Sequence, residues 1–258
     1  MPGLDPPESN EHMSAKICPR DETVSKLAEA LDSDFFLYVR GTPASGKTIL
    51  SLLLRDYYRR AGRTVFLLPT WEQKLDNLPG EDPWAKFAHV LKHKYRSVQK
   101  AEDFFADGNV IILDEAQTSY GDYSLWNQIM KDINGGMGYR IKLCLFSSYG
   151  NPNEGLPYYR TGRPTPVVFG PLQLLLLIPS DERRSLSTGL FYSKEEFETV
   201  ITKLCSSEIE KYSIDNDARN YIFSLTNGHP GAVDSIVSYL FQVRLASCVL
   251  TNLWVSCN

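Results

Sequence analysis

The stretch Leu37-Tyr-Val-Arg-Gly41-Thr-Pro-Ala-Ser-Gly46-Lys47-Thr48-Ile49-Leu50 sets the architecture expected for this chain. It matches the pattern GxxxxGK followed by Ser or Thr, with an apolar run before it (35–39) and a helical pattern after it (48–58). A strand, a glycine-containing turn and a helix in this order form a loop whose backbone N–H groups surround a phosphate chain. The alternative is an ordinary strand-to-helix turn with a surface lysine, and both flanks argue against it.

The residues of this turn have separate expected roles. Lys47 is expected to reach the β- and γ-phosphates, and the Thr48 hydroxyl to coordinate Mg²⁺ at the positive end of the helix dipole. The sequence therefore predicts ATP or another nucleoside triphosphate, with Mg²⁺, as the ligand. The predicted nucleotide-binding set is Gly41, Thr42, Pro43, Ala44, Ser45, Gly46, Lys47, Thr48 and Ile49.

Composition limits the remaining possibilities. The chain has 258 residues, of which 43% are hydrophobic, so it can bury a substantial core. A net charge of -4 gives no basic footprint for nucleic acid or an anionic membrane, although a local basic groove stays open. The five cysteines are widely spaced and indicate neither a disulfide framework nor a zinc site. With no signal peptide and no apolar span of membrane length, we expect an intracellular protein.

Apolar runs alternate with helical patterns along the first two thirds of the sequence. The run at 110–113 is continuously apolar and those at 35–39, 64–68 and 140–146 are largely so, and this suits strands of a parallel sheet covered on both faces. We therefore predict a doubly wound α/β fold, with helices at 83–95 and 123–133 and a fifth strand at 167–169.

The chain divides into four expected parts. Residues 1–18 are expected to be disordered and 19–179 to form the α/β domain. Residues 180–244 are expected to form a small helical lid, whose first helix starts with a capping box of Ser193 and Glu196. Residues 245–258 are left unassigned.

A second chemical motif follows the strand at 110–113. Asp114 ends a rigid apolar strand and is expected to bind the magnesium ion, while Glu115 is expected to activate the attacking water as general base. The alternative is a solvated strand terminus. Because the pair follows a phosphate loop in the same chain, the functional interpretation is favoured.

Weaker candidates surround this pair. Ser147 ends the next strand and is predicted to bond the γ-phosphate or the attacking water, with a loop-capping serine as the equal alternative. Gln117 is a candidate for positioning water, and Pro230, in Gly228-His229-Pro230, for contacting adenine. Arg160 and Arg163 fit solvated loop positions better than a catalytic role.

Taken together, Gly41 to Thr48, Ile112-Leu-Asp114-Glu115-Ala-Gln117 and Asn227-Gly-His-Pro230 resemble the STAND class of AAA-related P-loop NTPases. The phrase from Ile222 to Val233 is also similar to NTPase modules of Crinkler-type and retrotransposon-hot-spot-like proteins. The resemblance covers roughly residues 20–243.

The resemblance implies a sheet in which the strand ending at Ser147 lies between those ending at Arg40 and Glu115, followed by a helical lid with Pro230 at the adenine. It also implies an ATP-dependent switch with a protein partner or self-association. The winged-helix, repeat or nuclease modules usual in the class are not found, so a truncated gene product stays open. A nucleotide-binding interaction module without turnover is the main alternative, and a small-molecule phosphotransferase is a third.

Overall fold

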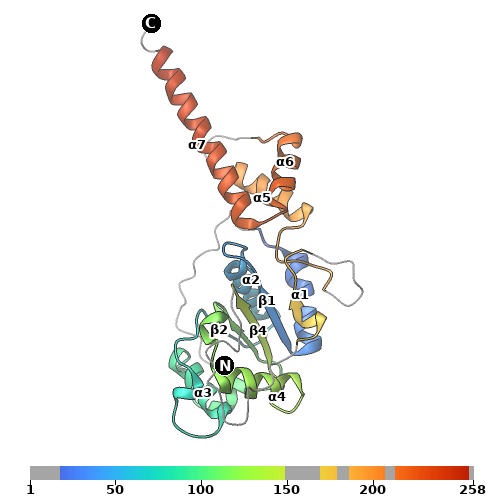
Figure 1. The fold of residues 1–258 in the computed structure, drawn as a ribbon, viewed down its shortest axis with the longest axis vertical. Helices are drawn as coiled ribbons and strands as arrows, with labels where there is room; N and C mark the ends of the chain where they lie inside the picture. Colours follow the sequence, from blue (N-terminus) through green and yellow to red (C-terminus); the bar gives the residue numbers. More distant parts are fainter. Residues whose placement is uncertain (1–17, 149–168, 179–185, 207–212, 256–258) are drawn as a thin grey trace. The chain divides into compact units, whose positions relative to one another are not determined.

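The computed structural model describes residues 18–148, 169–178, 186–206 and 213–255, with side chains described up to Val243. The chain forms two compact units (Figure 1). As far as they are described, the first comprises residues 20–43 and 47–190, and the second residues 18–19, 44–46 and 191–258. The predicted disordered segment lies almost wholly outside the described residues.

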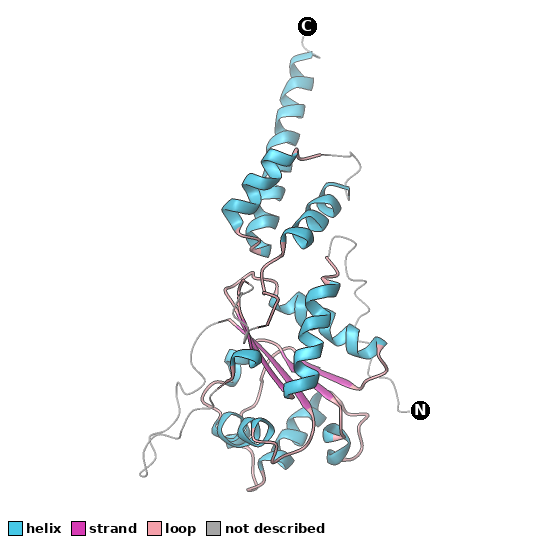
Figure 2. Cartoon of the chain, turned by 90° about the vertical axis from the view of Figure 1, so that its right-hand side faces the viewer, coloured by secondary structure: helices cyan, strands magenta, loops and turns pink. Residues whose placement is uncertain are grey.

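The first unit is built on a five-stranded, all-parallel sheet in the order β2-β3-β4-β1-β5, with helices on both faces (Figure 2). The predicted α/β class is confirmed. The strand that ends at Ser147 lies between the strand that ends at Arg40 and the strand that precedes Asp114 and Glu115, as the resemblance implied. Ser147 is in register with Arg40. The strands are β1 (Phe36–Arg40), β2 (Val65–Leu68), β3 (Val110–Leu113), β4 (Lys142–Ser147) and β5 (Leu174–Leu175).

Apart from Arg40, Lys142 and Ser147 at strand ends, the strands consist of apolar and aromatic residues, because their two faces meet two different hydrophobic cores. In β3, Val110 and Ile112 face α1 and α2, whereas Ile111 and Leu113 face α3 and the helix after residue 123. The period of two thus assigns each side chain to one core. The helices of this unit are α1 (Asp21–Asp34), α2 (Lys47–Arg60), α3 (Pro83–Lys94) and α4 (Met130–Asn134).

Two local predictions need correction. The helix predicted at 123–133 begins as a π-helix, η4 (Ser124–Ile129), before α4. The fifth strand is β5 at 174–175; Phe169 lies outside any strand and instead stacks on Phe36, with ring centroids 5.2 Å apart.

Short 3₁₀ helices fill four of the connections in the first unit. They are η1 (Leu75–Asn77), η2 (Ala101–Phe105), η3 (Ala116–Ser119) and η5 (Pro171–Gln173).

The described residues of the second unit form three helices, α5 (Lys194–Ser206), α6 (Asn216–Thr226) and α7 (Pro230–Val255). The capping box forms as predicted: Ser193 N donates to Glu196 Oε2 over 3.1 Å, and Glu196 N donates to Ser193 Oγ over 3.2 Å. Because α7 continues to Val255, most of the unassigned tail is helical.

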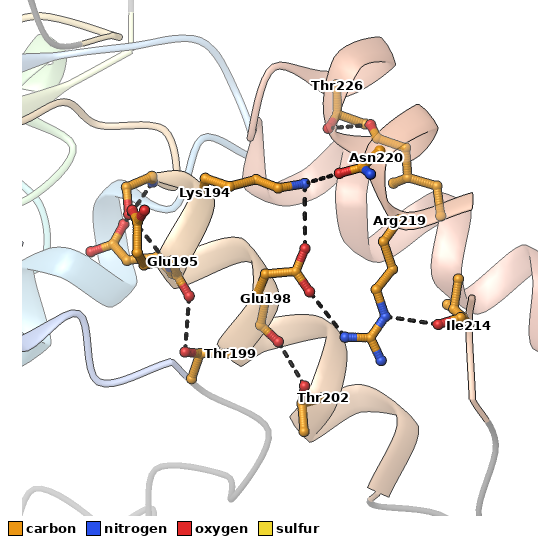
Figure 3. Close-up of polar contacts among 12 residues, drawn as sticks. Lys194, Glu195, Glu198, Thr199, Thr202, Ile214, Arg219, Asn220 and Thr226 are labelled. Carbon is orange, nitrogen blue, oxygen red and sulfur yellow. Dashed lines mark hydrogen bonds and ion pairs between the residues drawn. The ribbon is translucent and has the colours of Figure 1, made fainter. Parts of the chain in front are cut away.

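A polar network and a separate apolar core join α5 to α6. Glu198 accepts hydrogen bonds from Lys194 and Arg219, and Arg219 also donates to the Ile214 carbonyl (Figure 3). The core beneath contains Phe197, which packs edge-on against Phe223.

Among the described residues, no helix has the length and apolar character needed to cross a membrane.

Candidate functional site

The predicted phosphate loop lies between the carboxyl end of β1 and the start of α2. Gly41 N donates to the Ser147 carbonyl over 3.1 Å, which ties the start of the loop to the end of β4. Ala44 and Gly46 have positive φ values of 58° and 84°. Such a backbone is costly for a residue with a side chain, so Ala44 is a strained position in the loop.

Lys47 is buried, with only 6% of its surface exposed. Its ammonium group donates to the Thr42 carbonyl over 2.8 Å and to the Gly41 carbonyl over 3.3 Å. Lys47 is therefore not the surface lysine of the alternative interpretation. Burial lowers the pKa of Lys47, while the nearby carboxylates of Glu115 and Asp114 act in the opposite direction. The lysine therefore lies within the electrostatic range of both acidic residues.

Asp114 lies on the same side of the sheet as α2. Residues alternate between the two faces of a strand, so Asp114 continues the series of Val110 and Ile112 that faces this helix. Its carboxylate is 4% exposed and accepts hydrogen bonds from the Thr48 hydroxyl and from Glu115 N. Burial raises the pKa of Asp114, and these two hydrogen bonds oppose the rise. The structure thus brings Thr48 and Asp114 together.

These two groups fit a magnesium ion. Mg²⁺ prefers oxygen ligands and is usually held by one or two protein groups, with substrate phosphates and water completing the octahedron. A hydroxyl and a carboxylate in hydrogen-bond contact supply such a pair. The described residues contain no cluster of three or more His, Cys, Asp or Glu of the kind that would hold a metal without a substrate.

Glu115 has an unusual backbone conformation, with φ 46° and ψ 42°. Two hydrogen bonds from Thr118 hold its carbonyl, one from the backbone N at 2.9 Å and one from the hydroxyl at 2.8 Å. Its carboxylate accepts a hydrogen bond from the Gln117 side chain. Neither the positive φ nor the Gln117 contact follows from a sequence pattern.

Ser147 is fully buried, and its side chain belongs to a group of hydroxyls. The Ser147 hydroxyl contacts Tyr38 at 2.8 Å and Tyr120 at 3.2 Å, and the two tyrosine hydroxyls also contact each other. These hydroxyls lie with the Leu143 and Leu145 face of β4, on the other side of the sheet from Asp114. A role for Ser147 at a γ-phosphate stays a prediction. The sequence did not indicate that the Tyr38 hydroxyl would bond to Ser147 and Tyr120, because Tyr38 lies in an apolar run and fits an ordinary buried strand position.

The remaining candidates lie in the second unit or outside the described residues. Pro230 is the first residue of α7 and belongs to the second unit, as do residues 44–46 of the phosphate loop. Its Cγ would lie 3.3 Å from a Cβ added to Gly46. The next residue, Gly231, donates its N–H to the Ala44 carbonyl over 2.9 Å. Arg160 and Arg163 lie outside the described residues.

The strand order and the position of the loop between β1 and α2 define the fold as that of a P-loop NTPase. No model of a known protein family and no curated protein matches the sequence. Among solved structures, a mutant of RuvB from Thermotoga maritima is similar, with a TM-score of 0.39 and 14% identity. The match covers 85% of this chain and 61% of that one.

Proposed function

We propose that this chain is an ATP-binding, Mg²⁺-dependent NTPase of the STAND-like type that acts as a nucleotide-dependent switch. The observation that carries this proposal is the contact of Thr48 with Asp114 at the carboxyl ends of the strands. Lys47 and Glu115 lie close to this contact. A phosphate loop and a buried carboxylate at the carboxyl ends of strands in one parallel sheet provide an anion site and a metal ligand.

Each residue has one role in this proposal. Lys47 would exchange the Gly41 and Thr42 carbonyls for phosphate oxygens, and Thr48 with Asp114 would hold Mg²⁺. The bound ion supplies positive charge against the phosphates. Glu115 would accept a proton from the water whose oxygen attacks the γ-phosphorus, while the bond to the β–γ bridging oxygen breaks.

The second candidate is a nucleotide-binding interaction module without turnover, acting through a protein partner or self-association. Exposed apolar side chains on the second unit favour it: Tyr221 and Leu225 on α6, and Tyr239 on α7, are each more than 60% exposed. A phosphotransferase would need a pocket for an acceptor molecule, for which the sequence offers Trp71, Tyr120 and Tyr149. It is less well supported, because Trp71 is buried with its Nε1 donating to Asp122 and the Tyr120 hydroxyl donates to Ser147, while Tyr149 lies outside the described residues.

Thermal unfolding with ATP, GTP and ADP, each with and without Mg²⁺, tests the binding site. A ligand that binds only the folded state raises the free energy of unfolding by about 2.7 kcal/mol at 100 times its Kd. We expect an Mg²⁺-dependent rise with ATP in the wild type and none in Lys47→Met. An unchanged rise in Lys47→Met would refute the proposed site.

Phosphate release by Glu115→Gln separates the two candidates. For an NTPase we expect a loss of at least about a hundredfold, because the general base is removed, with ATP-induced stabilisation retained. A rate in the wild type that is already at the buffer blank, and that Glu115→Gln does not change, would favour the interaction module.

A further inference from the structure

Gln117 connects the carboxylate of Glu115 to the end of the neighbouring strand. Its Nε2 donates to Glu115 Oε2, and its Oε1 accepts a hydrogen bond from Ser148 N over 3.0 Å. Ser148 directly follows β4, whereas Glu115 lies just beyond Asp114 at the end of β3. One side-chain amide therefore spans the carboxyl ends of two adjacent strands.

The orientation of this amide follows from its partners. An ionised carboxylate only accepts hydrogen bonds, and a backbone N–H only donates. Gln117 must therefore present its NH₂ group to Glu115 and its oxygen to Ser148, and a flipped amide would break both contacts. Both ends of the side chain are consequently fixed, as a residue that orients another group requires.

The backbone of Glu115 is held independently. Its N–H donates to Asp114 Oδ1 over 3.0 Å, and Thr118 donates twice to its carbonyl. These contacts stabilise a left-handed conformation that costs a non-glycine residue about 1–2 kcal/mol. They fix where the side chain starts, but the direction of the carboxylate depends on its own contacts. The hydrogen bond from Gln117 is one that sets this direction.

We propose that Gln117 is a positioning residue for Glu115, which holds the carboxylate at the angle needed to accept a proton from the attacking water. This inference rests on the proposed hydrolytic function. Each carboxylate oxygen can accept two hydrogen bonds, so the bond from Gln117 to Oε2 leaves acceptor sites for water. The role predicted from sequence, direct positioning of water by Gln117, is replaced by an indirect one.

The test compares two substitutions that break different bonds. Gln117→Met has similar length and loses both hydrogen bonds. Gln117→Glu can still accept from Ser148 N but cannot donate to Glu115 when ionised. We expect kcat for phosphate release to fall about ten- to hundredfold in both, as for a catalytic group misplaced by about 1 Å. KM and the ATP-induced rise in Tm should stay unchanged. Gln99→Met, at an exposed glutamine outside the site, is the matched control.

Amide hydrogen exchange gives a readout in nucleotide-free protein. Exchange at Ser148 N should accelerate in Gln117→Met and stay slow in Gln117→Glu, because only the second variant keeps the acceptor. In a Glu115→Gln background, Gln117→Met should cause no further loss of rate, since the group it orients is already disabled.

The outcomes separate the two proposals. If wild-type protein binds ATP and releases phosphate but Gln117→Met retains the wild-type kcat, the positioning role is wrong and the NTPase assignment stands. If the wild type shows no ATP-induced stabilisation and no phosphate release, both proposals fail. A rise in KM with an unchanged kcat would assign Gln117 to ATP binding and overturn the positioning role.

Discussion

At the scale of single residues, Asp114 combines a functional position with a cost in stability. Its carboxylate is buried, and its pKa in the folded chain is raised above the ordinary value of 3.8. The folded state therefore binds this proton more tightly than the unfolded chain. As pH rises from 3.8 through the folded pKa, ionisation of Asp114 reduces the free energy of unfolding.

Replacing Asp114 with Asn should consequently stabilise the protein measured without nucleotide. Because Asn carries no charge that must be buried, we expect a Tm above that of the wild type at about pH 7. The gain should shrink as the pH is lowered toward 3.8. Thermal unfolding across this range measures it, and a variant less stable than wild type at neutral pH would contradict the prediction.

The same substitution should remove the Mg²⁺-dependent part of ATP-induced stabilisation, because a neutral amide is a poor ligand for this ion. Glu29→Gln, which changes an exposed carboxylate on α1, serves as the control and should alter neither quantity. Stability gained together with lost ligand response is the pattern expected where a charge is buried for function.

Sequence reasoning at this scale located the acidic pair but not its surroundings. Asp114 follows from strand alternation, since Val110 and Ile112 already assign its face. The left-handed backbone of Glu115, the burial of Lys47 and the bond from Gln117 depend on how the chain packs around them, and no local pattern of residues encodes them.

At the scale of elements, two aspartates hold the connection after β2 against the start of η4. Asp122 is fully buried and accepts hydrogen bonds from Trp71 Nε1 at 3.0 Å, Leu75 N at 2.6 Å and Leu125 N at 3.2 Å. Asp76 is exposed and accepts from Tyr123 N at 2.6 Å and from the backbone and hydroxyl of Ser124.

We expect different costs at these two positions. Asp122→Ala should lower the free energy of unfolding by about 3 kcal/mol, because it leaves buried donors without an acceptor. Asp76→Ala should cost about 1 kcal/mol, as for an exposed helix cap. Urea unfolding followed by tryptophan fluorescence measures both. Equal costs would show that burial does not determine the strength of these contacts.

The elements themselves were largely predictable, with informative exceptions. Apolar runs identified β1 to β4, since strands of a parallel sheet are buried on both faces. The strand at 174–175 has only two residues, which is too short to show a recognisable hydrophobic pattern in the sequence. The π-helix at the start of the 123–133 segment was missed because its residues have the same apolar spacing as an α-helix, and the wider turn leaves no pattern in the sequence.

At the scale of the whole molecule, the apolar cores of the two units have no residue in common. Those of the first unit line the two faces of the sheet, and that of the second lies among α5, α6 and α7 with Cys18. Buried apolar area is the main favourable term in folding. A cavity in one core should therefore destabilise its own unit and leave the other nearly unchanged.

Phe197 and Leu54 allow this to be tested in both directions. Each side chain is fully buried, Phe197 in the core of the second unit and Leu54 beside the sheet. Phe197→Ala should cost the second unit about 3–5 kcal/mol, and Leu54→Ala should cost the first unit about 2–5 kcal/mol.

In a Trp254→Phe background, the remaining tryptophans (Trp71, Trp84 and Trp126) all belong to the first unit. Fluorescence therefore follows the unfolding of the first unit, whereas far-ultraviolet circular dichroism follows the unfolding of both units. Phe197→Ala should therefore lower the midpoint of one dichroism transition and leave the fluorescence midpoint in place. Leu54→Ala should lower the fluorescence midpoint together with the other dichroism transition, and leave the dichroism transition of the second unit in place. A shift of both transitions by the same amount in either variant would mean that the two units unfold as one cooperative body.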